Sequence, residues 1–260
     1  MGSMTARTFD AVGVRAIVIE NLGRGSVNVE AGPRDDLVEG TVTADEELLH
    51  QASIRHEADT LRIWFPDQLF RTQTAHIRIG VPVGTALTAR TGSADVTATT
   101  PLGRCRLTTG SGDISLSGAT DLDVTSGSGS VSVGVLGGSA ARITSGSGDL
   151  VIGEARCALT AKSGSGDLLV RSLNAADLRA SSGSGDISVP STSGSVDLRT
   201  ASGSLTIGIA EGLTAWLDLS STSGAVRVAM NACSEPVEGE PYVSIRARTA
   251  SGEIAVYRAG

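Results

Sequence analysis

The sequence predicts an all-β protein that folds as a single-stranded parallel β-solenoid (β-helix) of about nine to ten coils, with about 18 residues per coil and an N-terminal β-rich cap. The first observation is a motif that recurs from about residue 77 to the end: a Gly-rich turn, an acidic or hydroxyl residue, and two apolar residues in alternation. The second is the period, because the first apolar residue of the motif returns every 17 to 19 residues. These positions are Val96, Ile114, Val131, Leu150, Leu168, Ile187 and Leu205.

Each coil is expected to contain two short strands. In the coil that starts at residue 114, Ile114 and Leu116 alternate with a serine, a glycine interrupts the run, and Leu122 and Val124 alternate with an aspartate. Alternation with a period of two places one side of each strand in the interior. Aliphatic ladders should therefore form a core between two sheets, and the series continues in sequence order as far as Leu219.

Two columns of glycine mark the turns, and both are assigned to backbone geometry. Glycine is needed where φ is positive or where stacked coils approach too closely for a Cβ atom. The turns lead into strands, and neither GxxxxGK[ST] nor a complete GxGxxG occurs, so they are not phosphate loops. The columns are Gly110, Gly127, Gly146, Gly164 and Gly183, and Gly112, Gly129, Gly148, Gly166 and Gly185.

Composition fits a folded protein without a nucleic-acid partner. The chain is 40% hydrophobic and 19% charged, and its 33 glycines do not recur at every third position, which excludes collagen. A formal net charge of −7 disfavours a nucleic-acid backbone or an anionic membrane as the default partner. No stretch reaches the roughly 18 to 20 apolar residues of a spanning helix, so no transmembrane segment and a cytoplasmic location are expected.

One continuous domain is expected, with a capping segment at residues 4–76 and solenoid repeats at residues 77–260. Residues 1–3 precede a second methionine and are interpreted as a cloning remnant. In the cap, strands are expected at residues 12–20, 25–30 and 61–65, and a short helix at residues 45–51. Trp64, Phe65 and Phe70 gather there and suit a plug that hides an open sheet edge. A loop at residues 231–241 and a strand at 243–249 are expected to close the other end.

Three cysteines without a CxxC pair indicate a reducing compartment. Cys105 and Cys157 fall at inward positions of their strands and are expected to be buried structural thiols. Cys233 lies in the predicted loop and is expected at the surface.

An aspartate follows the Gly-rich turn in most repeats, and Asp149, Asp167 and Asp186 occupy successive coils, about 4.8 Å apart. Like charges at this spacing repel by roughly 1 kcal/mol in water, so another interaction must offset the repulsion. One interpretation is Asx-type hydrogen bonding to neighbouring turn amides. The other is a metal site, with calcium as the candidate ion, because stacked carboxylates are hard oxygen ligands.

No enzyme activity is expected, and no catalytic or cofactor-binding residue is assigned. A serine nucleophile needs a base, but His50, His56 and His76 all precede the repeats. The chain also lacks the GxSxG and HExxH motifs.

Outward-facing columns of side chains offer the remaining candidate site. The column on the second sheet mixes acidic and basic residues, as expected for a solvated face with cross-strand ion pairs. The column on the first sheet is small and nearly uncharged, which fits either a contact surface for a partner or close stacking that favours small side chains. The second-sheet column is Arg106, Asp123, Arg142, Thr160, Arg179, Asp197 and Asp218. The predicted interaction face on the first sheet is Thr97, Ser115, Ser132, Val151, Leu169, Ser188 and Thr206.

The repeated Thr-Ser-Gly-Ser-Gly-Asp motif, followed by an aliphatic strand and a Gly-bounded second strand, resembles the bacterial "putative adhesin" domain family of unknown function. The resemblance covers almost the whole chain, including residues 23–29 and 61–83. It implies a parallel β-solenoid of bacterial origin that is associated with the cell envelope or its stress response, without catalytic residues to carry over.

Two classes of function follow. The first is a non-enzymatic scaffold or interaction module that presents a flat sheet face to an unknown protein, an envelope component or a second copy of the chain. A polymer-forming scaffold that resembles bactofilins is a variant of it. The second is a cation- or ligand-binding solenoid that uses the aspartate column.

Overall fold

The computed structural model describes residues 4–66, 74–230 and 242–259. Within this range the protein is all-β, and α1 (Glu46–Gln51) is the one α-helix of the described residues. The chain divides into two compact units, Met1–Val133 (unit 1) and Gly134–Gly260 (unit 2). Phe70, Cys233 and the loop expected at residues 231–241 lie outside the described residues.

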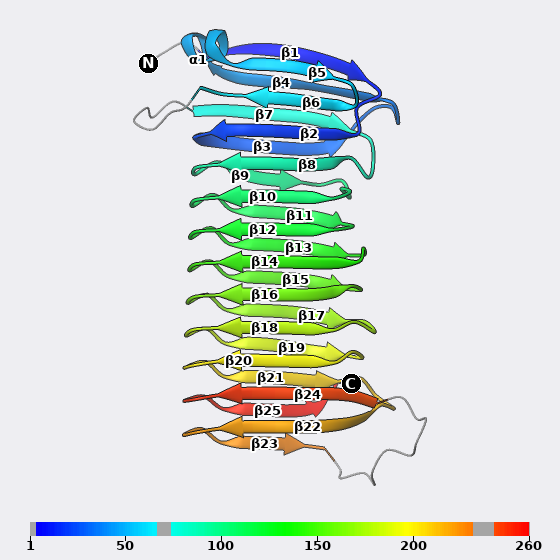
Figure 1. The fold of residues 1–260 in the computed structure, drawn as a ribbon, viewed down its shortest axis with the longest axis vertical. Helices are drawn as coiled ribbons and strands as arrows, with labels where there is room; N and C mark the ends of the chain where they lie inside the picture. Colours follow the sequence, from blue (N-terminus) through cyan, green and yellow to red (C-terminus); the bar gives the residue numbers. More distant parts are fainter. Residues whose placement is uncertain (1–3, 67–73, 231–241, 260) are drawn as a thin grey trace. The chain divides into compact units, whose positions relative to one another are not determined.

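Unit 1 contains two sheets whose strands are mostly parallel (Figure 1). Three pairings are antiparallel: β1 with β4, β4 with β7, and β5 with β6. The first sheet has the order β1 (Met4–Val12), β4 (Leu37–Asp45), β7 (Thr74–Val81), β3 (Arg24–Ala31), β9 (Asp95–Ala98) and β11 (Ile114–Ala119). The second has the order β12 (Leu122–Ser126), β10 (Cys105–Thr109), β8 (Ala86–Thr91), β2 (Ala16–Leu22), β6 (Thr60–Trp64) and β5 (Ser53–Glu57). Residues of β13 (Val131–Leu136) fall in both units.

Unit 2 also contains a first and a second sheet, and its strand pairings are parallel. The first sheet has the order β15 (Leu150–Ala155), β17 (Leu168–Leu173), β19 (Ile187–Thr192), β21 (Leu205–Ile209), β25 (Ile254–Arg258) and β23 (Val226–Ala229). The second has the order β14 (Ala140–Ser145), β16 (Ala158–Ser163), β18 (Leu178–Ser182), β20 (Val196–Thr200), β24 (Tyr242–Thr249) and β22 (Thr214–Ser221).

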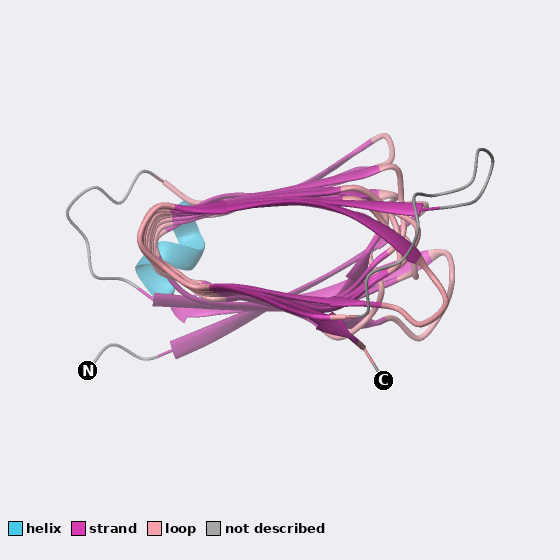
Figure 2. Ribbon diagram, turned by 90° about the horizontal axis from the view of Figure 1, so that it is seen from below, coloured by secondary structure: helices cyan, strands magenta, loops and turns pink. Residues whose placement is uncertain are grey.

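Within the repeats of each unit the chain alternates between the two sheets, so one strand from each sheet and the turns between them form a coil. Figure 2 shows the sheets as facing layers joined by loops. This arrangement agrees with the predicted all-β, solenoid-like fold. The total of about nine to ten coils stays a prediction.

Aliphatic ladders form the core, as the alternating pattern predicts. Leu168 pairs in register with Leu150 on one side and Ile187 on the other, and all three side chains are buried. Ile114 pairs in the same way with Val96. Burial of one such side chain stabilises the fold by about 1.5–3 kcal/mol, and a continuous ladder repeats this gain in every coil.

The spatial order of the coils departs from the sequence order in both units. In unit 1 the coil of β2 and β3 lies between the coil of β6 and β7 and the coil of β8 and β9. In unit 2 the coil of β24 and β25 lies between β20 and β21 on one side and β22 and β23 on the other. The expectation that Leu219 continues the series next to Leu198 is therefore wrong, because Ala247 pairs with both. All coils share one inward pattern, so the pattern alone cannot distinguish an inserted coil from a terminal one.

The turn glycines are explained by close approach rather than by φ. A Cβ atom on Gly166 would lie 2.2 Å from the carbonyl oxygen of Gly148, and one on Gly129 would lie 2.0 Å from that of Gly112. Positive φ angles occur at other glycines, including Gly13 and Gly84. The columns therefore exist because each turn stacks on the turn of the preceding coil.

The expected short helix is confirmed by α1, which follows Asp45 and buries Leu48 and Leu49 against β4 and β1. Phe65 is fully buried in the same unit, whereas Trp64 is 37% exposed. No helix among the described residues is both long and apolar enough to span a membrane.

Candidate functional site

The aspartate column forms a ladder of hydrogen bonds along the turns. Asp167 Oδ1 accepts the backbone N–H of Asp186 at 2.8 Å, and Asp149 Oδ1 accepts that of Asp167 at 2.9 Å. Asp186 Oδ1 accepts the N–H of Ser204 at 2.7 Å. Asp95 and Asp113 repeat the arrangement in unit 1. Each carboxylate therefore satisfies a backbone donor of the next coil, and these charge-assisted bonds offset the repulsion between stacked charges.

The predicted metal site consists of Asp149, Asp167 and Asp186. Within the described part of the chain, these aspartates are not arranged to hold a metal ion, and neither is any other group of three His, Cys, Asp or Glu residues. One oxygen of each carboxylate is already engaged by an amide. Calcium binding at the column stays a prediction.

Buried hydroxyl groups also stabilise these turns, and they were not among the predicted site residues. Ser163 Oγ accepts the N–H of Gly166 at 2.9 Å, and Ser182 Oγ accepts that of Gly185 at 2.9 Å. The position is buried, although serine and threonine usually occur at surfaces. Its strict recurrence three residues before the second glycine column was the available signal. Thr109, Ser145 and Thr200 make the equivalent bond.

The predicted interaction face does form outward rows on the first sheet of each unit. In unit 1, Thr97 pairs with Ser115, and Ser132 is exposed on β13. In unit 2 the row runs in register across four adjacent strands with half-buried side chains. Its members are Val151, Leu169, Ser188 and Thr206.

The inserted coil changes where this row ends. Ala255 on β25 lies beside Thr206, and Arg227 on β23 comes only after it. Arg227 is held by an ion pair to Glu253 at 2.7 Å. The uncharged row of unit 2 is therefore one residue longer than the sequence order indicated.

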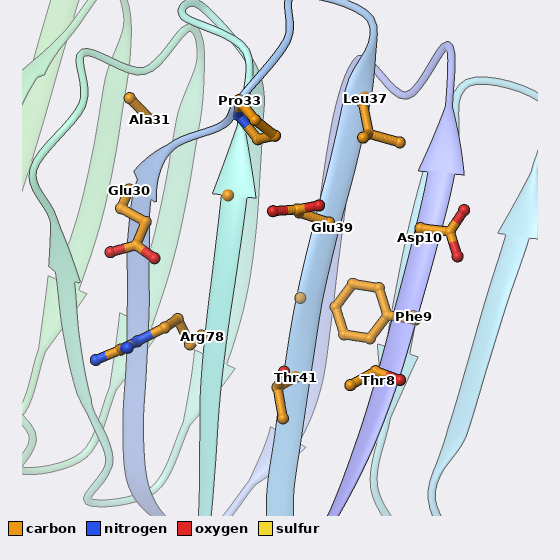
Figure 3. Close-up of a pocket in the computed structure, with 12 residues that line it drawn as sticks. Thr8, Phe9, Asp10, Glu30, Ala31, Pro33, Leu37, Glu39, Thr41 and Arg78 are labelled. Carbon is orange, nitrogen blue, oxygen red and sulfur yellow. The ribbon is translucent and has the colours of Figure 1, made fainter.

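A groove of about 550 Å³ opens on the first sheet of unit 1 (Figure 3). Phe9 lies directly opposite Gly40, and a Cβ atom on Gly40 would lie 2.5 Å from the ring. The ring therefore covers the glycine, a packing arrangement that stabilises glycine in sheets. Asp10, Glu30, Glu39 and Arg78 are the charged residues that line the groove.

A second groove, of about 680 Å³, lies on the outer face of the second sheet of unit 2. Arg142, Lys162 and Arg179 line it from β14, β16 and β18, together with Arg199 from β20. Arg199 donates two hydrogen bonds to Asp197, at 3.0 and 3.1 Å. The first three cations have no ion pair with any carboxylate in the described part of the molecule.

Arginines on neighbouring parts of this sheet behave differently. Asp218 accepts hydrogen bonds from Arg246 at 3.0 Å and from Arg248 at 3.1 Å, and the bond from Arg246 holds the pKa of Asp218 below its usual value. In unit 1, Arg106 faces Asp123 at 3.7 Å. Members of the mixed-sign column are thus paired at these places. In the groove, Asp197 of the same column binds Arg199, and Arg142 and Arg179 have no acidic partner among the described residues.

Cys105, Cys157 and His76, all within the described residues, show no catalytic arrangement. Cys105 and Cys157 are buried, and desolvation raises the pKa of the Cys105 thiol to about 12. The His76 ring Nδ1 lies 3.0 Å from Ser26 Oγ on an exposed face, and the His76 side chain makes no other hydrogen bond among the described residues. A serine–histidine pair without an orienting acid does not make an activated nucleophile.

The comparisons with known proteins agree with this fold. The family model described as "Toastrack DUF4097" matches residues 16–257. No curated protein matches the chain.

Two solved structures resemble the fold along nearly the full chain. A "putative adhesin" from Parabacteroides merdae ATCC 43184 has 13% sequence identity and a TM-score of 0.52, over 98% of this chain and 96% of that chain. A "putative lipid binding protein" from Parabacteroides distasonis ATCC 8503 has 16% identity and a TM-score of 0.49, over 98% and 97% of the two chains. At these identities the first likeness supports the fold, and the site must be argued from this chain's own residues.

Proposed function

The chain belongs to the Toastrack DUF4097 family, and on that premise we propose that it is a non-enzymatic, adhesin-like interaction module that presents the outer face of its first sheet to a protein or cell-envelope partner. The observation that carries the proposal is the row of Val151, Leu169, Ser188 and Thr206. These residues are small or aliphatic, uncharged and in register on adjacent strands.

The free-energy cost of covering such a row with a partner is small. Uncharged side chains cost less to desolvate than charged ones, and small side chains lose little rotamer entropy when a partner covers them. A rigid, hydrogen-bonded sheet also needs no ordering upon binding. The row therefore favours a flat, largely apolar contact whose affinity depends only weakly on salt.

The experiment compares capture of partners by the wild type and by two double variants. L169R/S188R places two charges on the row, and T108R/T125R places the same charges on exposed positions of the second sheet in unit 1. A specific partner from a native bacterial lysate is expected to bind the wild type and the control alike, at about 0.5 M salt. L169R/S188R should reduce capture at least about tenfold. Equal capture by all three proteins would rule out this face.

The alternative of a cation-binding solenoid is less favoured because an amide engages each carboxylate of the aspartate column. The polymer alternative needs an open edge at each end of a stack. β22 and β23 end the sheet orders of unit 2, whereas α1 packs on β1 and β4 in unit 1. A monodisperse species in light scattering and electron microscopy is the expected result, and filaments would support the polymer alternative.

A further inference from the structure

We propose that the groove on the second sheet of unit 2 is a binding site for an anion that carries more than one phosphate group, with Arg142, Lys162 and Arg179 as its principal contacts. This site lies on the other sheet from the proposed interaction face. It goes beyond the proposed function and does not depend on it.

Strand register brings the three cations together. Arg142, Thr160 and Arg179 occupy one outward row, because Arg142 pairs with Thr160 and Thr160 pairs with Arg179. Lys162 and Ser181 are paired in the next outward row, two residues further along the strands. With about 4.8 Å between neighbouring strands, the two guanidinium-bearing residues start about 10 Å apart, with the lysine diagonally between them.

The charge of the groove opposes the charge of the chain. The formal net charge is −7, yet the groove holds four cations and one carboxylate, and that carboxylate is engaged by Arg199. Charges beyond about 8 Å are largely screened at physiological salt, so the local cluster and not the net charge determines what the groove attracts.

The three cations lack counter-charges. Arg142 and Arg179 both lie opposite Thr160, and Arg179 also lies opposite Asp197, whose carboxylate binds Arg199 instead. None of Arg142, Lys162 and Arg179 forms an ion pair with a carboxylate of the residues that the structure describes. At Arg106 and Arg246, by contrast, an aspartate on an adjacent strand neutralises the arginine. An anionic ligand would supply the missing counter-charge.

The side chains fit phosphate groups. Guanidinium forks bind phosphate oxygens in bidentate fashion, and the ammonium of Lys162 adds a point charge between them. The hydroxyl groups of Thr160 and Ser181 line the same groove and can donate further hydrogen bonds. A separation of about 10 Å between the arginine positions exceeds the width of one phosphate, which favours a ligand with several. No aromatic side chain lines the groove to stack nucleic-acid bases.

The test uses the full chain and inorganic tripolyphosphate as the probe, with binding measured by isothermal titration calorimetry. The R142Q/K162Q/R179Q triple variant should weaken binding at least about tenfold, because each exchange removes a charge-assisted contact. R34Q/R62Q/R227Q is the matched control, since it removes the same charge at arginines that already have acidic partners. The control should bind as the wild type does, and raising the salt from about 50 mM to about 200 mM should weaken wild-type binding.

A single variant tests the direction of the electrostatic effect. D197N frees Arg199 from its carboxylate and should tighten tripolyphosphate binding. Melting temperatures of all variants should stay near that of the wild type, because the exchanged side chains are outward-facing. Absent binding to the wild type, or equal binding by the triple variant and the control, would overturn the proposal.

Co-sedimentation with lipid vesicles distinguishes two sources of the phosphate groups, lipid headgroups and a soluble or polymer-borne phosphate. Co-sedimentation with phosphatidylglycerol vesicles that is lost in the triple variant and displaced by tripolyphosphate would assign the phosphates to lipid headgroups. Tripolyphosphate binding without co-sedimentation would assign them to a soluble or polymer-borne phosphate. Neither outcome tests the proposed interaction face, because that face lies on the first sheet and the groove lies on the second.

Discussion

Asp167 and Asp186, whose carboxylates carry like charges on successive coils, are joined by a hydrogen bond: the backbone N–H of Asp186 donates to Asp167 Oδ1 at 2.8 Å. The bond converts a repulsive column into a connection between layers. The Oδ1 atom of each carboxylate therefore has a structural role as a hydrogen-bond acceptor, in addition to the charge that the carboxylate carries.

This relationship predicts an order of stability. D167N keeps an acceptor oxygen and removes one charge from the column, so its free energy of unfolding should stay within about 0.5 kcal/mol of the wild type. D167A leaves the Asp186 amide without its partner and should lose about 1 kcal/mol. Urea denaturation measures both values, with S165A, an exposed residue of the same turn, as the control. Equal stability of D167A and D167N would contradict a role for the acceptor.

Chelation should leave the protein unchanged. One oxygen of each of Asp149, Asp167 and Asp186 already accepts a backbone amide hydrogen bond. Addition of about 1 mM EDTA, a large excess over the protein, should therefore not shift the melting temperature. Scanning calorimetry with added calcium is the reciprocal measurement. A fall in melting temperature with the chelator that calcium restores would instead establish the metal site.

The stacked turns predict a sharp difference between two glycines. Gly166→Ala should destabilise the protein by about 3 kcal/mol or more, since the new Cβ would lie 2.2 Å from the Gly148 carbonyl oxygen and backbone atoms must move. Gly137→Ala has no atom within 4 Å of the new Cβ and should change stability little. Thermal and chemical unfolding of both variants provide the comparison. Similar melting temperatures would show that the coils relax more easily than their geometry implies.

Cys105 should be unreactive in the native state. Burial raises its pKa from 9.0 to about 12, so the thiol stays protonated, and iodoacetamide at about pH 8 should label it only after unfolding. Mass spectrometry of tryptic peptides measures the labelling.

The same shift has a consequence for stability at high pH. A raised pKa in the folded state means that the contribution of Cys105 is complete below the unfolded value, near 9.0, and is lost as the pH rises toward about 12. The wild type should therefore lose more stability than C105A across this window. Parallel pH dependences of the two proteins would argue against a strongly shifted thiol.

The repeat pattern predicted the aliphatic ladders because burial imposes the same requirement on every coil. Leu168 could be assigned to the core from its spacing alone, and Asp167 could be placed at a turn. The partner of the Asp167 carboxylate is one coil away, however, and only the register between coils identifies it. The hydroxyl of Ser163 bonds to Gly166 within its own turn and was missed because a serine in a Gly-rich turn is ordinarily expected at the surface.

The order of the coils and the cationic groove depend on the same long-range information. Ala247 and Leu219 carry equivalent inward positions, and which of them adjoins Leu198 follows from the path of the chain and not from local pattern. Arg142 and Arg179 were assigned to an ordinary solvated column. Lys162 belongs to the adjacent row, so the cluster is visible only when both rows are considered.

Inserted coils set a limit on when unit 2 can be completed during synthesis. β22 and β23 pair with β24 and β25, which emerge from the ribosome after them. A nascent chain can add coils in order up to β21, but its next two strands must then wait without neighbours until residues 242–258 arrive and enter between them and the growing stack. The final step of assembly is therefore a cooperative closure of two layers, and a ribosome stalled within this stretch would expose unpaired strands that invite aggregation.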